Sequence, residues 1–189
     1  MDLSETLESY FRDEVNRAFD VEGVERHELT QHYLVQLLAG YASHPVESGP
    51  LAIRFMTALS ESPRERKTHL REIGDTSLFV SGFWGDSLTR SLVDVDYYIE
   101  LGETAYGELA GASAAGPFGS EVFARLARNF ARFVEVLMTI RRRTSGAAGS
   151  HQIVRLYERW MRTRSDWAAR RLAEEGVFPF GRAARTAVG

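Results

Sequence analysis

The amino-acid sequence predicts an all-α protein, a single-domain helical bundle of about seven helices. Apolar residues recur at steps of three and four through most of the chain, which is the spacing of amphipathic helices. No stretch of useful length alternates apolar and polar residues as a half-buried strand would. The chain has 189 residues, a length that suits one domain. We expect this domain to cover residues 1–180 and a flexible C-terminal tail to cover residues 181–189.

The first three predicted helices are separated by residues that favour turns. The first covers residues 4–19, and the glycine-containing segment 20–23 interrupts its apolar pattern. The second covers residues 25–42, because the pair His44-Pro45 disfavours helical backbone just before the proline. A short third helix covers residues 51–59.

The next two helices form the centre of the predicted bundle. Ser62 precedes Pro63 and stands three residues before Glu65, a pattern that caps a helix beginning at Pro63. This helix is expected to end near residues 82–85, and its partner to cover residues 92–109.

Small residues line the inner face of the first central helix, where Gly74, Ser77 and Ser81 fall at helical spacing. Glycine inside a helix costs about 1 kcal/mol relative to alanine. We expect another helix, or a ligand, to approach this groove closely and to compensate for that cost.

Two tyrosines, Tyr98 and Tyr106, face inward from the second central helix. A buried tyrosine hydroxyl needs a hydrogen-bond partner, and the nearby aspartates Asp75, Asp94 and Asp96 are candidates. The sequence therefore predicts a polar cluster in the core. It is either a structural network or a ligand site.

The last third of the chain contains two predicted helices joined by flexible links. Ser120 is expected to cap a helix that ends in three arginines at 141–143, where the helix dipole favours cations. Residues 110–119 form the first link and residues 144–149 the second, and a long final helix covers residues 150–176.

Charge is distributed unevenly along the chain. Residues 1–62, 63–113 and 114–189 carry net charges of −7, −4 and +8, and all but one of the 23 basic residues are arginine. The basic third either offers a surface to an acidic partner or neutralises the acidic segments within the fold.

Composition excludes several classes of site and segment. The chain contains no cysteine, which rules out disulfides, thiolate zinc sites and cysteine nucleophiles. The N-terminus lacks a secretion signal, and no window approaches eighteen uninterrupted apolar residues. We therefore expect a cytoplasmic protein with no membrane partner.

One short motif invites a catalytic interpretation. The run Gly85-Asp86-Ser87-Leu88 resembles the block for which a family of serine hydrolases is named, and this resemblance implies a serine nucleophile. The resemblance covers four residues only. The family's later Gly-x-Asn-Asp and Asp-x-x-His motifs are missing here. We therefore expect Ser87 or Ser91 to cap a helix after a glycine turn.

Metal and cofactor motifs are also incomplete. His27 and His32 are five residues apart, so they lie about 140° apart around a helix and cannot chelate one ion. No phosphate-binding loop is present. We predict no cofactor. An irregular metal site would have to assemble from Glu28, His32, His69, Glu72, Asp75 and Glu135.

Two main functional hypotheses follow. The first is a non-catalytic interaction or regulatory protein that binds a protein partner through an arginine-rich C-terminal surface comprising Arg141, Arg142, Arg143, Arg155, Arg159 and Arg162. The alternative is a small-molecule or metal-binding protein, which includes an enzyme, with a core site around His69, Asp75, Tyr98 and Tyr106. Nucleic-acid binding is a third hypothesis, and homodimerisation is left open.

Overall fold

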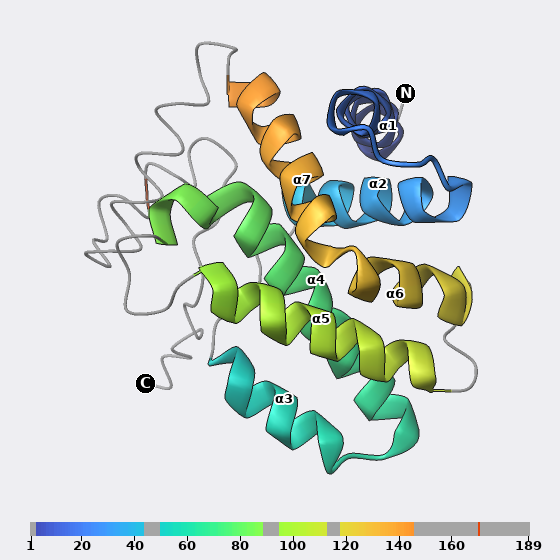
Figure 1. The fold of residues 1–189 in the computed structure, drawn as a ribbon, viewed down its shortest axis with the longest axis vertical. Helices are drawn as coiled ribbons and strands as arrows, with labels where there is room; N and C mark the ends of the chain where they lie inside the picture. The colour runs from blue at the N-terminus through green and yellow to red at the C-terminus, as the bar shows by residue number, and fades with distance from the viewer. Residues whose placement is uncertain (1–2, 44–49, 89–94, 113–117, 146–169, 171–189) are drawn as a thin grey trace, which may run out of the picture.

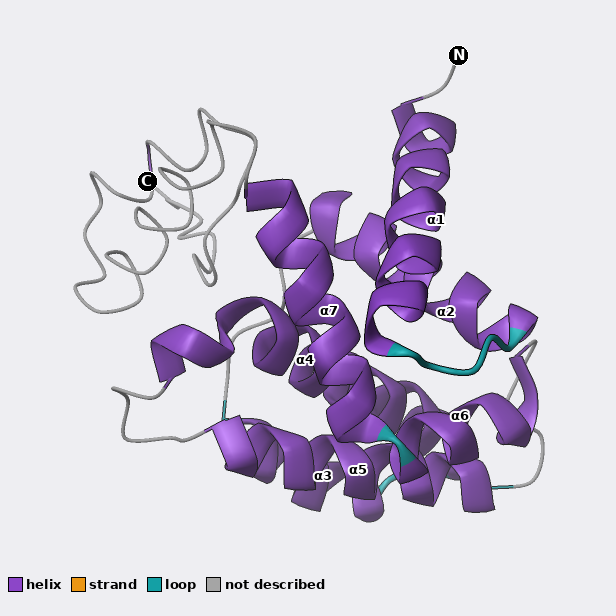
Figure 2. Ribbon diagram, turned by 45° about the horizontal axis from the view of Figure 1, so that its top comes forward, coloured by secondary structure: helices purple, strands orange, loops and turns teal. Residues whose placement is uncertain are grey.

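The computed structural model describes residues 3–43, 50–88, 95–112, 118–145 and 170, and over these ranges it confirms the all-α fold (Figures 1 and 2). The described residues form seven helices and no strand. The helices are α1 (Leu3–Glu22), α2 (Glu28–Ser43), α3 (Leu51–Leu59), α4 (Pro63–Leu88), α5 (Val95–Gly111), α6 (Gly119–Arg128) and α7 (Phe130–Ser145).

The seven helices are not quite the seven that the sequence predicts. The predicted helix over residues 120–143 is divided at Asn129 into α6 and α7. The Asn129 side chain donates to the Arg125 carbonyl at 3.1 Å, and such short polar side chains compete with regular helix bonding. Apart from residue 170, the predicted final helix and the tail lie outside the described residues, so the domain boundary at residue 180 stays a prediction.

The start of α4 is as predicted, but its end is not. The Ser62 hydroxyl donates to the Glu65 carboxylate at 2.6 Å beside the first helical residue, Pro63. The helix continues past its expected end at residues 82–85 as far as Leu88. Ser87 therefore lies inside a helix and does not cap one, while the alternative, Ser91, lies outside the described residues.

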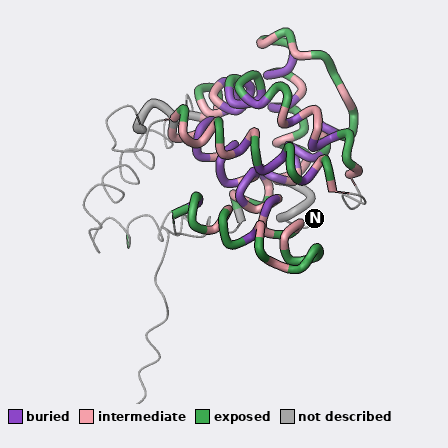
Figure 3. The backbone as a smooth tube through the Cα atoms, turned by 60° about the horizontal axis from the view of Figure 1, so that its bottom comes forward, coloured by how far each residue is buried: buried purple, intermediate pink, exposed green. Residues whose placement is uncertain are grey.

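Helix α4 occupies the centre of the arrangement. It packs against α5 along its length and also contacts α3 and α7, while α1 packs against α2 and α7 (Figure 1). Buried positions gather on the inward sides of these helices, and exposed positions cover the outside (Figure 3).

Glycines set the close spacing of the central helices. A Cβ built on Gly74 would lie 2.5 Å from the Tyr106 ring, and one on Gly82 would lie 2.4 Å from Leu137. On α5, a Cβ at Gly102 would lie 2.2 Å from the Phe130 ring. The predicted close approach at Gly74 is therefore made by helix α5, whose Tyr106 side chain fills the groove beside it.

Candidate functional site

A largely buried carboxylate, Asp75 of α4, whose side chain is 18% exposed, organises the polar cluster in the core. Its Oδ1 accepts hydrogen bonds from two tyrosine hydroxyls, Tyr106 of α5 at 2.7 Å and Tyr33 of α2. Its Oδ2 faces the guanidinium of Arg71, one helical turn earlier, at 3.7 Å. Three helices that are distant in sequence thus meet at one carboxylate.

Aromatic rings enclose the cluster on its inner side. The rings of Tyr33 and Tyr106 both pack against Phe123 of α6, with centroids 5.3 and 5.8 Å away. Toward the surface, the Arg71 guanidinium lies 5.2 Å from the Tyr33 ring centroid and 5.7 Å from that of Phe118. Arg71 is 42% exposed, so it links the buried carboxylate to solvent.

Burial dominates the electrostatics of the cluster. It raises the pKa of Asp75 to about 6, although the hydrogen bonds from Tyr33 and Tyr106 and the charge of Arg71 act in the opposite direction. Burial, followed by the nearby Asp75 charge, holds the pKa values of Tyr33 and Tyr106 well above the ordinary value. Near neutral pH the tyrosines therefore remain donors to an ionised carboxylate.

The Asp75 carboxylate has a pKa suited to a general base, but both of its oxygens already face partners within the protein. A carboxylate with a pKa near 6 exchanges its proton close to neutral pH. Both tyrosine hydroxyls bind the same oxygen, and the other oxygen faces Arg71. As it stands, the cluster ties α2, α4 and α5 together.

Only two of the four predicted core-site residues meet. Asp75 and Tyr106 are bonded to each other, as the inward-facing tyrosine pattern suggests. Tyr98 is half-buried and packs edge-on against its neighbour Tyr97, with centroids 5.2 Å apart. His69 is 41% exposed and its Nδ1 lies 2.5 Å from Glu61 Oε2, which raises the pKa of the histidine.

Sequence reasoning missed Tyr33 and Arg71 as members of the cluster. Tyr33 falls at helical spacing with Leu37 in the predicted second helix, so it faces the core, and the need of its hydroxyl for a partner was a usable signal. Arg71 stands four residues before Asp75, a spacing that brings the two side chains together on a helix.

The described residues offer no grouped metal ligands. No cluster of three or more histidine, cysteine, aspartate or glutamate side chains able to hold an ion occurs among them. His32, one of the candidates, packs instead against the Phe118 ring with centroids 5.8 Å apart.

The arginine-rich surface is only partly within the described residues. Arg155, Arg159 and Arg162 lie outside them. Arg142 is exposed and has no ion-pair partner in the described part of the chain, whereas Arg141 is partly buried and engaged in a contact. Arg143 donates to Glu14 of α1 at 2.9 Å.

Much of the basic C-terminal charge in the described residues is used inside the fold. Arg125 of α6 pairs with Glu25 at 3.2 Å, and Arg132 of α7 donates to the Glu22 carbonyl at 2.9 Å. Thr139 donates to the Glu22 carboxylate at 2.5 Å. Some of the arginines of the basic last third therefore join α6 and α7 to the acidic N-terminal segment.

Glu14 is shared by two cations. The glutamate is 8% exposed, with Oε1 2.8 Å from Arg17 and Oε2 2.9 Å from Arg143. One carboxylate thus fixes two guanidinium groups at the junction of α1 and α7. The group of Arg17, Glu14 and Arg143 therefore has one more positive than negative charge.

No protein-family model, curated protein or solved structure matches the chain. No helix among the described residues is long and apolar enough to cross a membrane.

Proposed function

We propose that the chain is a non-catalytic helical protein that binds an acidic protein partner through the arginine-rich surface at the junction of α1 and α7. The observation that supports this most is the sharing of Glu14 by Arg17 and Arg143. The two arginines and the one carboxylate together carry a single net positive charge where α1 meets α7. Electrostatic complementarity of this kind favours fast and specific association with a negative surface.

The exposed Arg142 supplies the group that is ready for contact. It requires no rearrangement of the fold, because it has no ion-pair partner among the described residues. Arginine also suits an interface, since its planar guanidinium binds a carboxylate through two parallel hydrogen bonds. Arg155, Arg159 and Arg162 belong to the proposed surface by sequence alone.

Affinity purification of the full chain at native expression tests this proposal. Partners captured by the wild type should be lost with Arg142→Glu. They should be retained with Arg128→Glu, which changes an exposed arginine on α6 that bonds the Ala124 carbonyl of its own helix. Capture of no protein, or equal capture by Arg142→Glu and the wild type, would refute the proposal.

Nucleic acid is the competing partner for a cationic surface. Binding to duplex DNA weakens steeply with salt, because displaced counterions drive it, and it does not depend on a protein partner. Capture that disappears after nuclease treatment, together with salt-sensitive binding of mixed-sequence duplex DNA by the purified chain, would favour this alternative.

A second candidate function is the binding of a ligand or an enzyme substrate at the Asp75 cluster. It is favoured by the raised pKa of Asp75 and by the path to solvent along Arg71. Groups with shifted pKa values are enriched at functional sites, although structural networks also shift them. Elemental analysis and an absorption spectrum of the purified protein test this candidate, since a stoichiometric metal or a cofactor band would place it first.

A further inference from the structure

The outward face of α3 is apolar and exposed. Ile53 and Met56 stand three residues apart on this nine-residue helix, so they lie on one side of it, and they are 63% and 66% exposed. No other helix in the described part of the chain exposes two large apolar side chains within one turn of each other. Such a pair favours contact with another apolar surface, because the contact removes both side chains from water.

Helix α5 runs beside α3 and is acidic (Figures 1 and 2). The Ala52 amide in the first turn of α3 donates to the Tyr97 hydroxyl in the first turn of α5 at 3.0 Å, so the two helices start close together. Over its 17 residues α5 has no basic residue. Asp96, Glu100 and Glu103 follow at steps of four and three on its outer side, and their carboxylates have no ion-pair or hydrogen-bond partner among the described residues.

We define the α3–α5 surface as Ile53, Met56, Asp96, Glu100 and Glu103. Like charges at helical spacing destabilise a helix, so a covering segment gains from supplying cations as well as apolar side chains. A third helix, which is about 10 Å wide with its side chains, touches both helices when it lies along them. The surface therefore fits an amphipathic helix with cations in or beside its apolar stripe.

The chain itself carries a segment of this kind. Residues 146–189 follow α7, and within them the sequence predicts a helix over residues 150–176. Its apolar stripe contains Ile153, Leu156, Trp160 and Trp167. Arg164 and Arg171 fall in the same stripe, seven residues apart, the spacing that also separates the first and last carboxylates of the α3–α5 surface. Two cations in an apolar stripe need carboxylate partners once the stripe is covered.

The opposite side of this predicted helix is also basic. Arg155, Arg159, Arg162 and Arg170 fall on it at helical spacing. The structure describes Arg170, which is helical and exposed. Docking through the apolar stripe requires this exposure, because it leaves the opposite side in solvent.

The segment is long enough to reach the α3–α5 surface from the end of α7. A domain of about 145 residues has a radius of gyration of about 15 Å and is therefore about 40 Å across. From Ser145 to Trp160 the chain spans about 50 Å when extended, and about 30 Å when residues 150–160 are helical. The end of α7 and the start of α3 both lie toward the left of Figure 1. These lengths allow docking within one chain.

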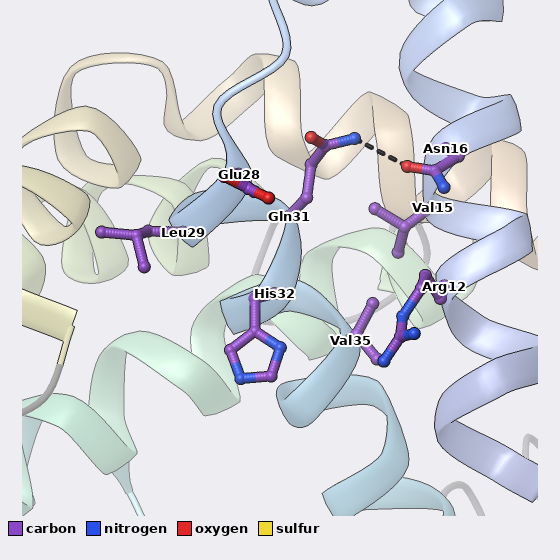
Figure 4. A pocket seen from close by; sticks show the side chains of 8 residues that line it. All are labelled: Arg12, Val15, Asn16, Glu28, Leu29, Gln31, His32 and Val35. Atoms are coloured by element: carbon purple, nitrogen blue, oxygen red, sulfur yellow. Dashed lines mark hydrogen bonds between the residues drawn. The ribbon is translucent and has the colours of Figure 1, made fainter. Parts of the chain in front are cut away.

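The pocket between α1 and α2 offers this segment no comparable contact. The pocket has a volume of about 470 Å³ and is lined mainly by polar side chains, namely those of Arg12, Asn16, Glu28, Gln31 and His32 (Figure 4). Its valines, Val15 and Val35, are 0% and 2% exposed, so their surface is already covered. Among its lining residues, only Leu29 is a large apolar side chain that is left exposed. An apolar stripe therefore gains less there than on α3.

We propose that residues 153–171 of the same chain dock on the α3–α5 surface as a helix. Their apolar stripe packs against Ile53 and Met56, and Arg164 and Arg171 pair with the α5 carboxylates. The outer arginines of the segment then face solvent. The docking stands by itself. Its consequence, that the docked helix presents these outer arginines to an acidic partner, rests on the proposed function.

Paramagnetic NMR of the full chain tests the docking. Because the chain has no cysteine, Ser165→Cys carries a single spin label beside the apolar stripe. We expect the label to broaden the amide signals of Ile53, Met56 and Glu100 and to leave those of α1, at the opposite end of Figure 1 from α3, unchanged. Ile53→Asp should remove most of this broadening. Val21→Asp, the matched control with an apolar side chain 64% exposed on α1, should keep it.

The charge pairing has its own test. The double variant Arg164→Gln/Arg171→Gln should lose broadening of α5. The double variant Arg155→Gln/Arg159→Gln removes the same number of charges from the outer side of the segment and should keep it. Equal loss in the two double variants would show a general attraction between charges and not this orientation, and it would overturn the proposal.

A mixed sample distinguishes the same chain from a second copy. It contains isotope-labelled chain without the spin label and spin-labelled chain without the isotope. Broadening of α3 and α5 in this mixture would place a second copy on the surface and overturn the proposal, as would no broadening of α3 and α5 in the singly labelled chain. No partner is present in these samples, so a negative result leaves the proposed function, tested by Arg142→Glu, untouched.

Discussion

The replacement of Gly102 by alanine tests the packing at the centre of the fold. Gly102 lies in α5, where an added Cβ would be 2.2 Å from Phe130 Cζ and 2.9 Å from Ser77 Cβ. Phe130 is only 1% exposed, so its ring cannot turn aside into solvent. Gly107 in the same helix is the matched control, because nothing lies within 4 Å of the same added atom.

The two substitutions should have opposite signs. Each gains about 1 kcal/mol of helix propensity. At Gly102 the added methyl overpacks a closed core, which costs about 1–3 kcal/mol, and the very short contact with a buried ring favours the upper end. We expect Gly102→Ala to lose about 2 kcal/mol of the free energy of unfolding and Gly107→Ala to gain about 1 kcal/mol.

Urea unfolding followed by circular dichroism measures the difference. A gap of about 3 kcal/mol separates the two midpoints by about 1 M at a slope near 3 kcal/mol per molar. Equal midpoints for the two variants, with unchanged slopes, would show that α5 does not approach α4 and α7 as closely as the structure has it.

The remaining predictions concern the titrating groups. Between the ordinary pKa of 3.8 and about 6 the folded state binds the extra proton on Asp75, so stability should fall as pH rises through this window. Both tyrosines bind one oxygen of Asp75, so Asp75→Asn should keep those hydrogen bonds. Measured by urea unfolding, the free energy of unfolding of this variant relative to the wild type should rise by about 3 kcal/mol between pH 4 and 7. A pH-independent difference would contradict the raised pKa. Tyr106→Phe removes a donor to a buried charge and should lower the free energy of unfolding by about 1–3 kcal/mol at pH 7, against no loss for exposed Tyr10→Phe. The pKa of His69 is raised in the folded state, so its pairing with Glu61 stabilises the fold at low pH, and this stabilisation is lost as pH rises through the folded-state pKa. NMR titration of the wild type and Glu61→Gln checks this, since the histidine pKa should be lower in the variant.

The sequence predicts the members of the Asp75 cluster that have a local signal and misses a pairing between residues that are far apart along the chain. Asp75 and Tyr106 were predicted because each shows itself locally, one as an acid and the other as an inward tyrosine that needs an acceptor. Tyr33 is 42 residues from Asp75, so the pairing depends on how α2 lies against α4. His69 and Tyr98 fit the same helical periods as Asp75 and Tyr106, but the packing of the helices leaves His69 exposed and Tyr98 half-buried.

The sequence by itself determined the helical class, the start of α4 at Pro63 and the tight approach at Gly74, because capping, periodicity and side-chain volume act over a few neighbouring residues. Only the tertiary structure decided which cations are neutralised, since Arg143 and Glu14 meet across 129 residues of chain. It also decided the pocket between α1 and α2. Long-range pairing depends on how whole helices pack, and local patterns do not encode that geometry.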